Sequence, residues 1–137
     1  MFFSPAPPQL QPRLAECVQT DPQFGADIGG VTPVFFPFDA EAEFDSWLTI
    51  GPTDGSAGDA LGASPGLGLG DWSPSAAFST NNGAVFWMDP TNGPSGGDPI
   101  VLAQITNVEG SGTASAMMQG RNADGSADWT QDVSWSW

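Results

Sequence analysis

The apolar runs of this chain are short and are separated by many turn residues, so strands rather than helices are its natural elements. The 137 residues include 18 glycines and 13 prolines. A loop rich in Gly, Pro, Ser and Asp runs from Pro52 to Ser75, and Asn82-Gly83 is a strong tight-turn signal. This pattern predicts an all-β fold, a β-sandwich of the jelly-roll or Ig-like kind with long Gly/Pro/Asp-rich loops.

Several segments have the composition expected of strands. They are residues 31–38, 44–50, 84–88, 100–106, 112–119 and 132–137. Pro33 and Pro37 would confine the first segment to a sheet edge or bulge. Residues 100–106 are mostly apolar at odd- and even-numbered positions alike, so both faces of a strand there would be apolar, which favours a central strand. In the last segment Val133, Trp135 and Trp137 recur at period two and should share one face.

The first thirty residues differ in composition from the rest and predict a separate unit. Proline is dense between residues 5 and 12, which favours extended backbone. We therefore divide the chain into an extended Pro-rich docking arm, residues 1–30, and a β-sandwich domain, residues 31–137. The surface that orders the arm is either its own domain or a partner. Its candidate partner-binding residues are Phe2, Phe3, Phe24 and Arg13.

The charge balance is strongly acidic and excludes one class of partner. The chain has no Lys, no His and no Tyr, and two Arg face sixteen carboxylates, for a net charge of −14. Nucleic-acid affinity comes mainly from cationic side chains, so nucleic-acid binding is excluded. Nine Phe and six Trp supply enough apolar area for a folded core, unlike disordered acidic chains.

The residue inventory also argues against common catalytic chemistry. With no His and a single cysteine, Cys17, the chain lacks the groups of nucleophilic triads, zinc sites and haem ligation. Cys17 cannot form an internal disulfide and is expected to be a small buried hydrophobe. The expected core tryptophans are Trp47, Trp87 and Trp135. An acid glycosidase using two carboxylates ranks last among the functions considered.

Acidic loops make calcium the metal to weigh. Candidate ligands are Asp54 and Asp59 in one loop, and Asp124 and Asp128 in another. Neither loop fits the EF-hand pattern, and Asp-Gly is a common hairpin turn, which is the preferred interpretation. Arg121 lies close to the second loop and is expected to be a structural ion-pair anchor.

The localisation prediction rests on what the sequence contains. No stretch approaches the ~20 apolar residues of a membrane span, and the start of the chain lacks a signal-peptide pattern. The protein is then either cytosolic or a mature form without its targeting segment. The resemblance described next favours the second, an extracytoplasmic protein (secreted, cell-surface or in an organelle lumen).

A family resemblance supports export. The segments that carry it are residues 44–51, 79–86, 89–90, 101–106 and 119–121, with the sequences FDSWLTIG, STNNGAVF, DP, VLAQIT and QGR. Over about residues 34–134 this order resembles a module of secreted or cell-surface proteins of planctomycetes, cyanobacteria and marine algae. The resemblance implies a β-rich exported domain of unestablished function, with no catalytic residues to transfer.

Together these observations predict a non-enzymatic structural or interaction subunit that needs no cofactor. Its arm would dock the acidic β module on a protein partner within a larger assembly, such as an algal photosystem with its antenna. The alternative is a calcium-dependent glycan-binding or adhesive module of a secreted protein.

Overall fold

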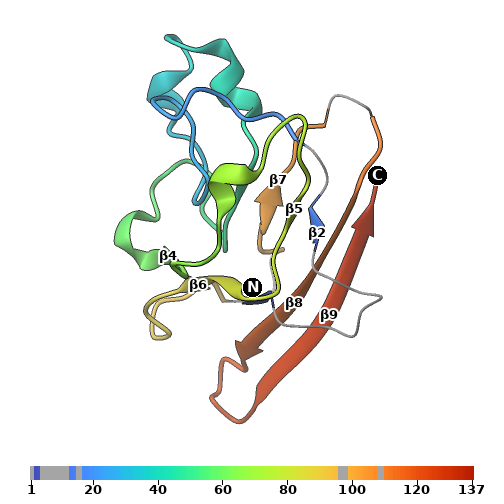
Figure 1. Ribbon diagram of the computed structural model, residues 1–137. Coiled ribbons are helices and arrows are strands. Elements are labelled where there is room, and N and C mark those ends of the chain that lie inside the picture. Colours follow the sequence, from blue (N-terminus) through green and yellow to red (C-terminus); the bar gives the residue numbers. More distant parts are fainter. Residues whose placement is uncertain (1, 4–12, 15–16, 96–98, 108–109) are drawn as a thin grey trace.

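The fold is built from short strands and short 3-10 helices (Figure 1). The computed structural model describes residues 2–3, 13–14, 17–95, 99–107 and 110–137. Its strands are β1 (Phe2–Phe3), β2 (Arg13–Leu14), β3 (Trp47–Leu48), β4 (Leu61–Ala63), β5 (Phe78–Ser79), β6 (Gly83–Trp87), β7 (Ala103–Gln104), β8 (Thr113–Arg121) and β9 (Asp128–Ser136). Its 3-10 helices are η1 (Pro33–Phe35), η2 (Ala40–Phe44), η3 (Gly58–Ala60) and η4 (Leu69–Asp71). The prediction of a β-rich chain is confirmed. No helix within these ranges is long and apolar enough to cross a membrane.

Strand β8 is the centre of a seven-stranded antiparallel sheet. Strand β9 pairs with β8 along its whole length and so occupies one edge of β8. Strands β1 and β2 must therefore share the other edge, where Phe2 lies opposite Met117 and Leu14 lies opposite Ala114. Beyond β1 the sheet continues through β6 to β4, and beyond β2 it continues to β5. A second sheet contains only β3 and β7, so the described strands do not establish a closed sandwich.

The β8–β9 hairpin confirms three predictions from the sequence. Residues 112–119 and 132–137 lie almost wholly within its two strands. Its Asp-Gly turn places Gly125 at a φ of 69°, a left-handed conformation that favours glycine. Arg121 Nε donates to Asp128 Oδ1 at 2.7 Å across the hairpin, as expected of an ion-pair anchor. Both side chains are more than half exposed, so this pair adds little stability.

The segment 45–49 is buried throughout and connects two neighbouring stretches of backbone. No residue in it is more than 4% exposed. The Leu48 N–H donates to the Asp27 carbonyl at 3.0 Å, and the Thr49 N–H donates to the Leu102 carbonyl at 2.8 Å. Of the strand predicted at residues 44–50, only Trp47–Leu48 is a strand, and neighbours cover both of its faces. Phe44 ends η2 and is 55% exposed.

The first predicted strand, residues 31–38, is wrong. Its centre is the 3-10 helix η1, which begins at Pro33. The Phe36 N–H donates to the Pro33 carbonyl at 3.2 Å, and the Phe38 N–H donates to the Phe35 carbonyl at 2.9 Å. Proline fixes φ at a value that suits the first position of a helix and needs no donor there. Pro33, one of the two prolines that weakened the strand prediction, therefore begins a helical turn.

The predicted central strand, residues 100–106, is also wrong in its position. Only Ala103–Gln104 is a strand, and it pairs with β3 outside the main sheet. Ile100 and Val101 are 43% and 41% exposed. Its apolar residues have two kinds of surroundings. Leu102, Ala103 and Ile105 pack against the buried core, whereas Val101 lines two hollows.

The Asn82-Gly83 turn does not join a hairpin. The flanking strands β5 and β6 pair with different neighbours, β2 for the first and β1 and β4 for the second. Gly83 instead allows Leu67 to pack closely against its backbone, because a Cβ at Gly83 would collide with the Leu67 side chain. Glycine at this position reflects packing rather than a hairpin turn.

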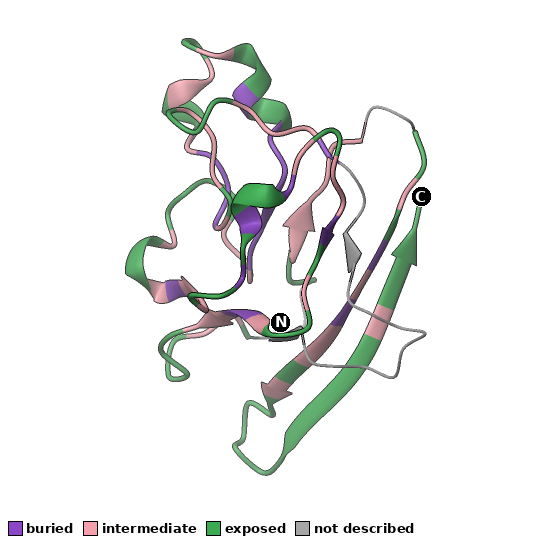
Figure 2. Ribbon diagram, in the orientation of Figure 1, coloured by how far each residue is buried: buried purple, intermediate pink, exposed green. Residues whose placement is uncertain are grey.

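Two apolar clusters form the core (Figure 2). The larger contains Leu48, Val85 and Cys17, which are fully buried, so the prediction for Cys17 is confirmed. Burial is also the main reason why the pKa of the Cys17 thiol is raised. The smaller cluster contains Trp47 at 4% exposure, as predicted. Trp135, however, is 41% exposed, so its assignment to the core is wrong.

Candidate functional site

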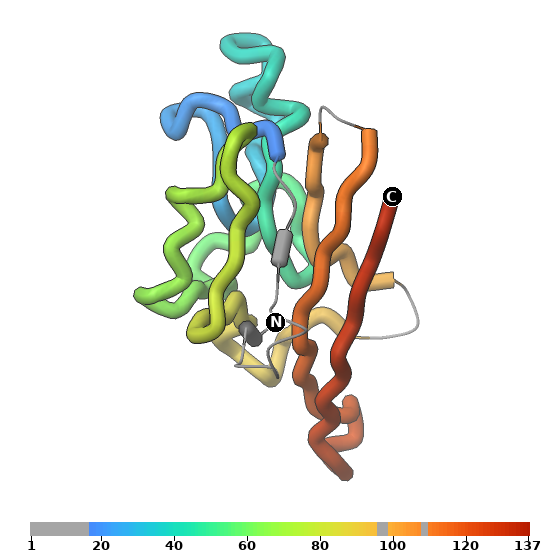
Figure 3. Tube along the Cα trace, turned by 45° about the vertical axis from the view of Figure 1, so that its right-hand side comes forward, coloured from blue at the N-terminus to red at the C-terminus, as the bar shows by residue number. Residues whose placement is uncertain are grey.

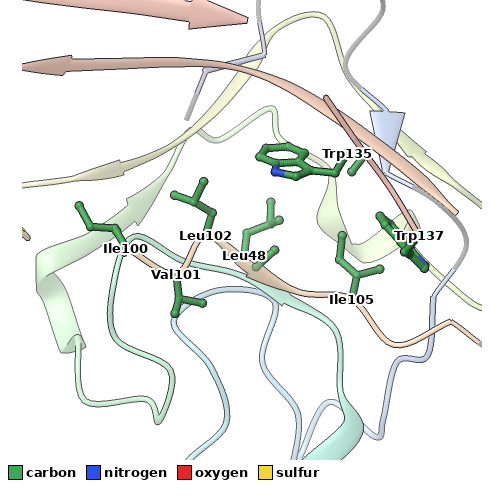
Figure 4. Close-up of a pocket in the computed structure, with 9 residues that line it drawn as sticks. Leu48, Ile100, Val101, Leu102, Ile105, Trp135 and Trp137 are labelled. Atoms are coloured by element: carbon green, nitrogen blue, oxygen red, sulfur yellow. The ribbon is translucent and has the colours of Figure 1, made fainter. Parts of the chain in front are cut away.

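An apolar hollow, called the Trp groove below, lies between the β8–β9 hairpin and residues 100–105 (Figure 4). Its volume is about 420 Å³. The residues that line it are Leu48, Ile100, Val101, Leu102, Ala103, Ile105, Ala114, Trp135 and Trp137. None of these side chains is ionisable or carries a hydroxyl, amide or carboxyl group. The groove can exclude water and bind apolar groups, but its side chains cannot supply a general acid or base.

Strand geometry explains how the hairpin builds one wall of the Trp groove. Trp135 and Trp137 are two residues apart, so both side chains lie on the same face of the hairpin. Directly across from Trp135 on β8 is Ala114, and across from Val133 is Ala116. These small side chains leave room above β8, so the indole ring of Trp135 can lie toward Leu102 and Leu48, while that of Trp137 lies beside Ile105 (Figure 4). The prediction that Val133, Trp135 and Trp137 share a face is confirmed.

The rim of the Trp groove exposes more apolar surface than its floor. Trp135, Trp137, Ile100 and Val101 are between 41% and 43% exposed, whereas Leu48 at the floor is fully buried. Exposed apolar surface is unfavourable at about 25 cal/mol per Å². Apolar patches that gather around a concavity are typical of contact sites. The rim therefore has the form of a binding surface.

A second hollow, of about 210 Å³, contains two carboxylates, Asp27 and Asp45. Asp45 is fully buried, and its Oδ1 and Oδ2 accept backbone N–H groups of Thr20 at 2.9 Å and Ala26 at 2.8 Å. Desolvation, with a further contribution from the Asp45 charge, raises the pKa of Asp27. Because Asp45 already binds two backbone donors, its evident role is to fix the chain around it.

Three of the four candidate calcium ligands have local partners. Asp54 Oδ1 accepts the Ser56 N–H at 3.0 Å, Asp124 Oδ1 accepts the Ser126 N–H at 2.9 Å, and Asp128 pairs with Arg121. These partners lower the pKa of each of the three carboxyls. Asp59 lies in the exposed helix η3. Across the described ranges, no three His, Cys, Asp or Glu side chains gather in a group that could hold a metal ion.

The predicted docking residues lie in several parts of the fold. The backbone of Phe2–Phe3 and of Arg13–Leu14 pairs within the chain's own sheet. Phe24 is half-buried and contacts Phe35 edge-on, with ring centroids 6.0 Å apart. The proline run from residue 5 to residue 12 lies outside the described residues. The described strands of the arm, β1 and β2, therefore pair with the chain's own β domain and not with a partner.

Sequence reasoning missed the residues of the Trp groove as a site. It predicts Trp135 in the core, and Ile100 and Val101 in a buried strand. The period-two pattern at the end of the chain was the available signal, but it could not show which apolar face would remain uncovered.

Comparisons with known proteins found no family model, no curated protein and no solved structure that matches this chain. The resemblance to an exported algal and bacterial module therefore stays a prediction.

Proposed function

We propose that this chain is a non-enzymatic protein-interaction module that binds its partner at the Trp groove. The observation that carries the proposal is the ring of four apolar side chains, each more than two-fifths exposed, around a hollow without ionisable groups. Large exposed aromatic side chains beside a preformed hollow are typical of residues that dominate binding energy. The Trp groove replaces the arm as the proposed docking surface, because the described strands of the arm already pair within the sheet.

Charge and polarity define the partner. The groove would accept an apolar or aromatic segment of a protein, and the net charge of −14 favours cationic residues around that segment. The proposed module is an extracytoplasmic β-sandwich of the jelly-roll or Ig-like kind. It would belong to a larger assembly, such as an algal photosystem with its antenna. The family resemblance supports the extracytoplasmic location.

Substitution of Trp135 in the groove should weaken assembly. Tagged chain is added to gently solubilised source material and separated on a native gel, and comigrating proteins are identified by mass spectrometry. We expect wild type to comigrate with a larger species, and Trp135→Ala to weaken that association by about thirtyfold or more, as expected for the loss of an interface hot spot.

Trp129→Ala is the matched control for this experiment. Trp129 is on the same strand and face and is 43% exposed, but it does not line the groove. It should assemble as wild type does. Equal assembly by Trp135→Ala and wild type, with both folded by thermal melting, would refute the proposed site.

A glycan-binding module is the second candidate, and the two exposed tryptophans of the groove favour it because indole rings can stack on sugars. The lining side chains argue against it, because sugar hydroxyls need several hydrogen-bond partners and the indole N–H groups of Trp135 and Trp137 are the only side-chain donors there. Its calcium-dependent form makes a separate prediction. Under our proposal, millimolar calcium leaves the melting temperature of the chain unchanged. If calcium instead raises the melting temperature, and the double substitution Asp124→Asn with Asp128→Asn removes that rise, the calcium-dependent module is supported.

A further inference from the structure

The hydrogen-bond register of the β8–β9 hairpin shows which backbone groups of β9 point away from the sheet. Gly112 and Trp137 exchange two backbone hydrogen bonds, at 3.0 and 3.1 Å, and therefore form a hydrogen-bonded pair. Such pairs alternate along an antiparallel ladder. The Asn122 N–H, which donates to the Ala127 carbonyl at 2.9 Å, fits the same alternation at the turn. Residues 129, 131, 133 and 135 thus direct their backbone groups toward β8, whereas residues 130, 132, 134 and 136 direct theirs outward.

The outward edge of β9 is regular, and apart from Asp128, which pairs with Arg121, its one charged residue is Asp132. It is nine residues long and contains no proline, lysine or glycine, and its residues are exposed except Val133. Figure 3 shows it beside β8 at the margin of the molecule. Among the described residues β9 pairs only with β8. A long, regular edge of this kind is a template for another strand.

We propose that β9 accepts an extended segment of a protein partner as an added strand, and that cationic and apolar residues alternate in that segment. The added strand would pair with the outward backbone groups of Thr130, Asp132 and Ser134. This inference rests on the proposed function, because the strand lies beside the Trp groove and contacts the same partner.

The two faces of β9 define the alternation in the incoming segment. Val133 and Trp135 lie on the groove face. They would form non-hydrogen-bonded pairs with the new strand, and in such pairs the cross-strand side chains come closest. Apolar residues of the incoming segment should pack there. Asp132 lies on the opposite face across from Met117, and the nearby Arg121 is already paired with Asp128. A lysine or arginine opposite Asp132 would neutralise its charge.

Charge argues against a second copy of this chain as the added strand. Two copies of β9 could pair with each other in antiparallel fashion. The register that pairs most of their residues is centred on residue 132, and it places the two Asp132 carboxylates directly opposite each other. Like charges in that position are destabilising. Each copy also carries a net charge of −14. A cationic partner meets neither obstacle.

The test uses two synthetic peptides of the length of β9, one alternating lysine with valine and the other alternating glutamate with valine. Amide hydrogen exchange of the full chain is followed by NMR. We expect the lysine peptide to slow exchange at Thr130, Asp132 and Ser134, and to leave Gln131 and Val133 unchanged because their N–H groups already face β8. The glutamate peptide should have no effect.

Two variants make the test specific. Ser134→Pro removes an outward N–H and leaves the hydrogen bonds to β8 in place, so the hairpin should persist while peptide binding falls about tenfold or more. Asp132→Lys should weaken binding of the lysine peptide by a similar factor and allow the glutamate peptide to bind. Tryptophan fluorescence checks that both variants are folded.

Several outcomes would overturn the inference. One is that the lysine peptide perturbs the indole signals of Trp135 and Trp137 without protecting the outward amides; strand addition then fails while the Trp groove stands as a binding site. Absence of any effect of the peptide also overturns it, and the native-gel comparison of Trp135→Ala still decides the proposed function. Concentration-dependent protection of the same amides without peptide would identify a second copy as the occupant and refute the cationic partner.

Discussion

Replacing Gly30 by alanine should destabilise the fold by about 3 kcal/mol or more, because strain and overpacking add at this position. Gly30 has a φ of 80°, and a Cβ there would overlap the backbone carbonyl of Thr53. Gly30 also forms an antiparallel bridge with Asp54, so the two backbones cannot separate without loss of this contact. Urea unfolding followed by tryptophan fluorescence measures the change.

Gly68→Ala is the matched control for Gly30→Ala. Gly68 has a similar φ of 66°, but a Cβ there would meet nothing within 4 Å. Gly68→Ala should lower the free energy of unfolding by only about 1–2 kcal/mol, the strain of a left-handed residue. The difference between the two variants then measures the collision with Thr53. Equal losses in the two variants would show that the two backbones are not in close contact.

Asp45→Ala should also destabilise the chain by about 3 kcal/mol or more. The substitution leaves the backbone N–H groups of Thr20 and Ala26 without the carboxylate that accepts them. A buried donor left unsatisfied costs about 1–3 kcal/mol, and here the loss of two partly buried donors adds to the space left by the fully buried Asp45 side chain. Unfolding in urea at neutral pH, with Asp59→Ala as an exposed control, measures the difference. If the two variants lose equal stability, the buried carboxylate is not what holds this part of the chain.

The β8–β9 hairpin could be predicted from the sequence because all its determinants are local. The Asp-Gly turn, the period-two apolar residues and the nearby Arg121 lie within one short stretch of chain. Residues 84–88 could be predicted for the same reason, since a short, almost wholly apolar run nearly coincides with β6. Strand propensity and face alternation act over a few residues and can be recognised directly.

The remaining features depend on contacts between distant segments. Residues 100–106 have the composition of a central strand, and nothing in them shows that hollows would lie on both sides. The prediction of Trp135 in the core failed because the distance between the hairpin and Leu102 cannot be known from either segment alone. The prediction for residues 31–38 failed for a local reason, because proline suits a sheet edge and the first turn of a helix equally well.

The sharing of one edge of β8 by β1 and β2 has a consequence for the order of folding. Phe2 and Leu14 pair with Met117 and Ala114, so contacts join the two ends of the chain across almost its whole length. Loops of that size close slowly, and chains dominated by distant contacts fold slowly. During synthesis β6 and β5 emerge long before β8, so the described main sheet cannot be completed until the C-terminal hairpin has left the ribosome. Completion of the main sheet therefore follows the synthesis of β8 and β9.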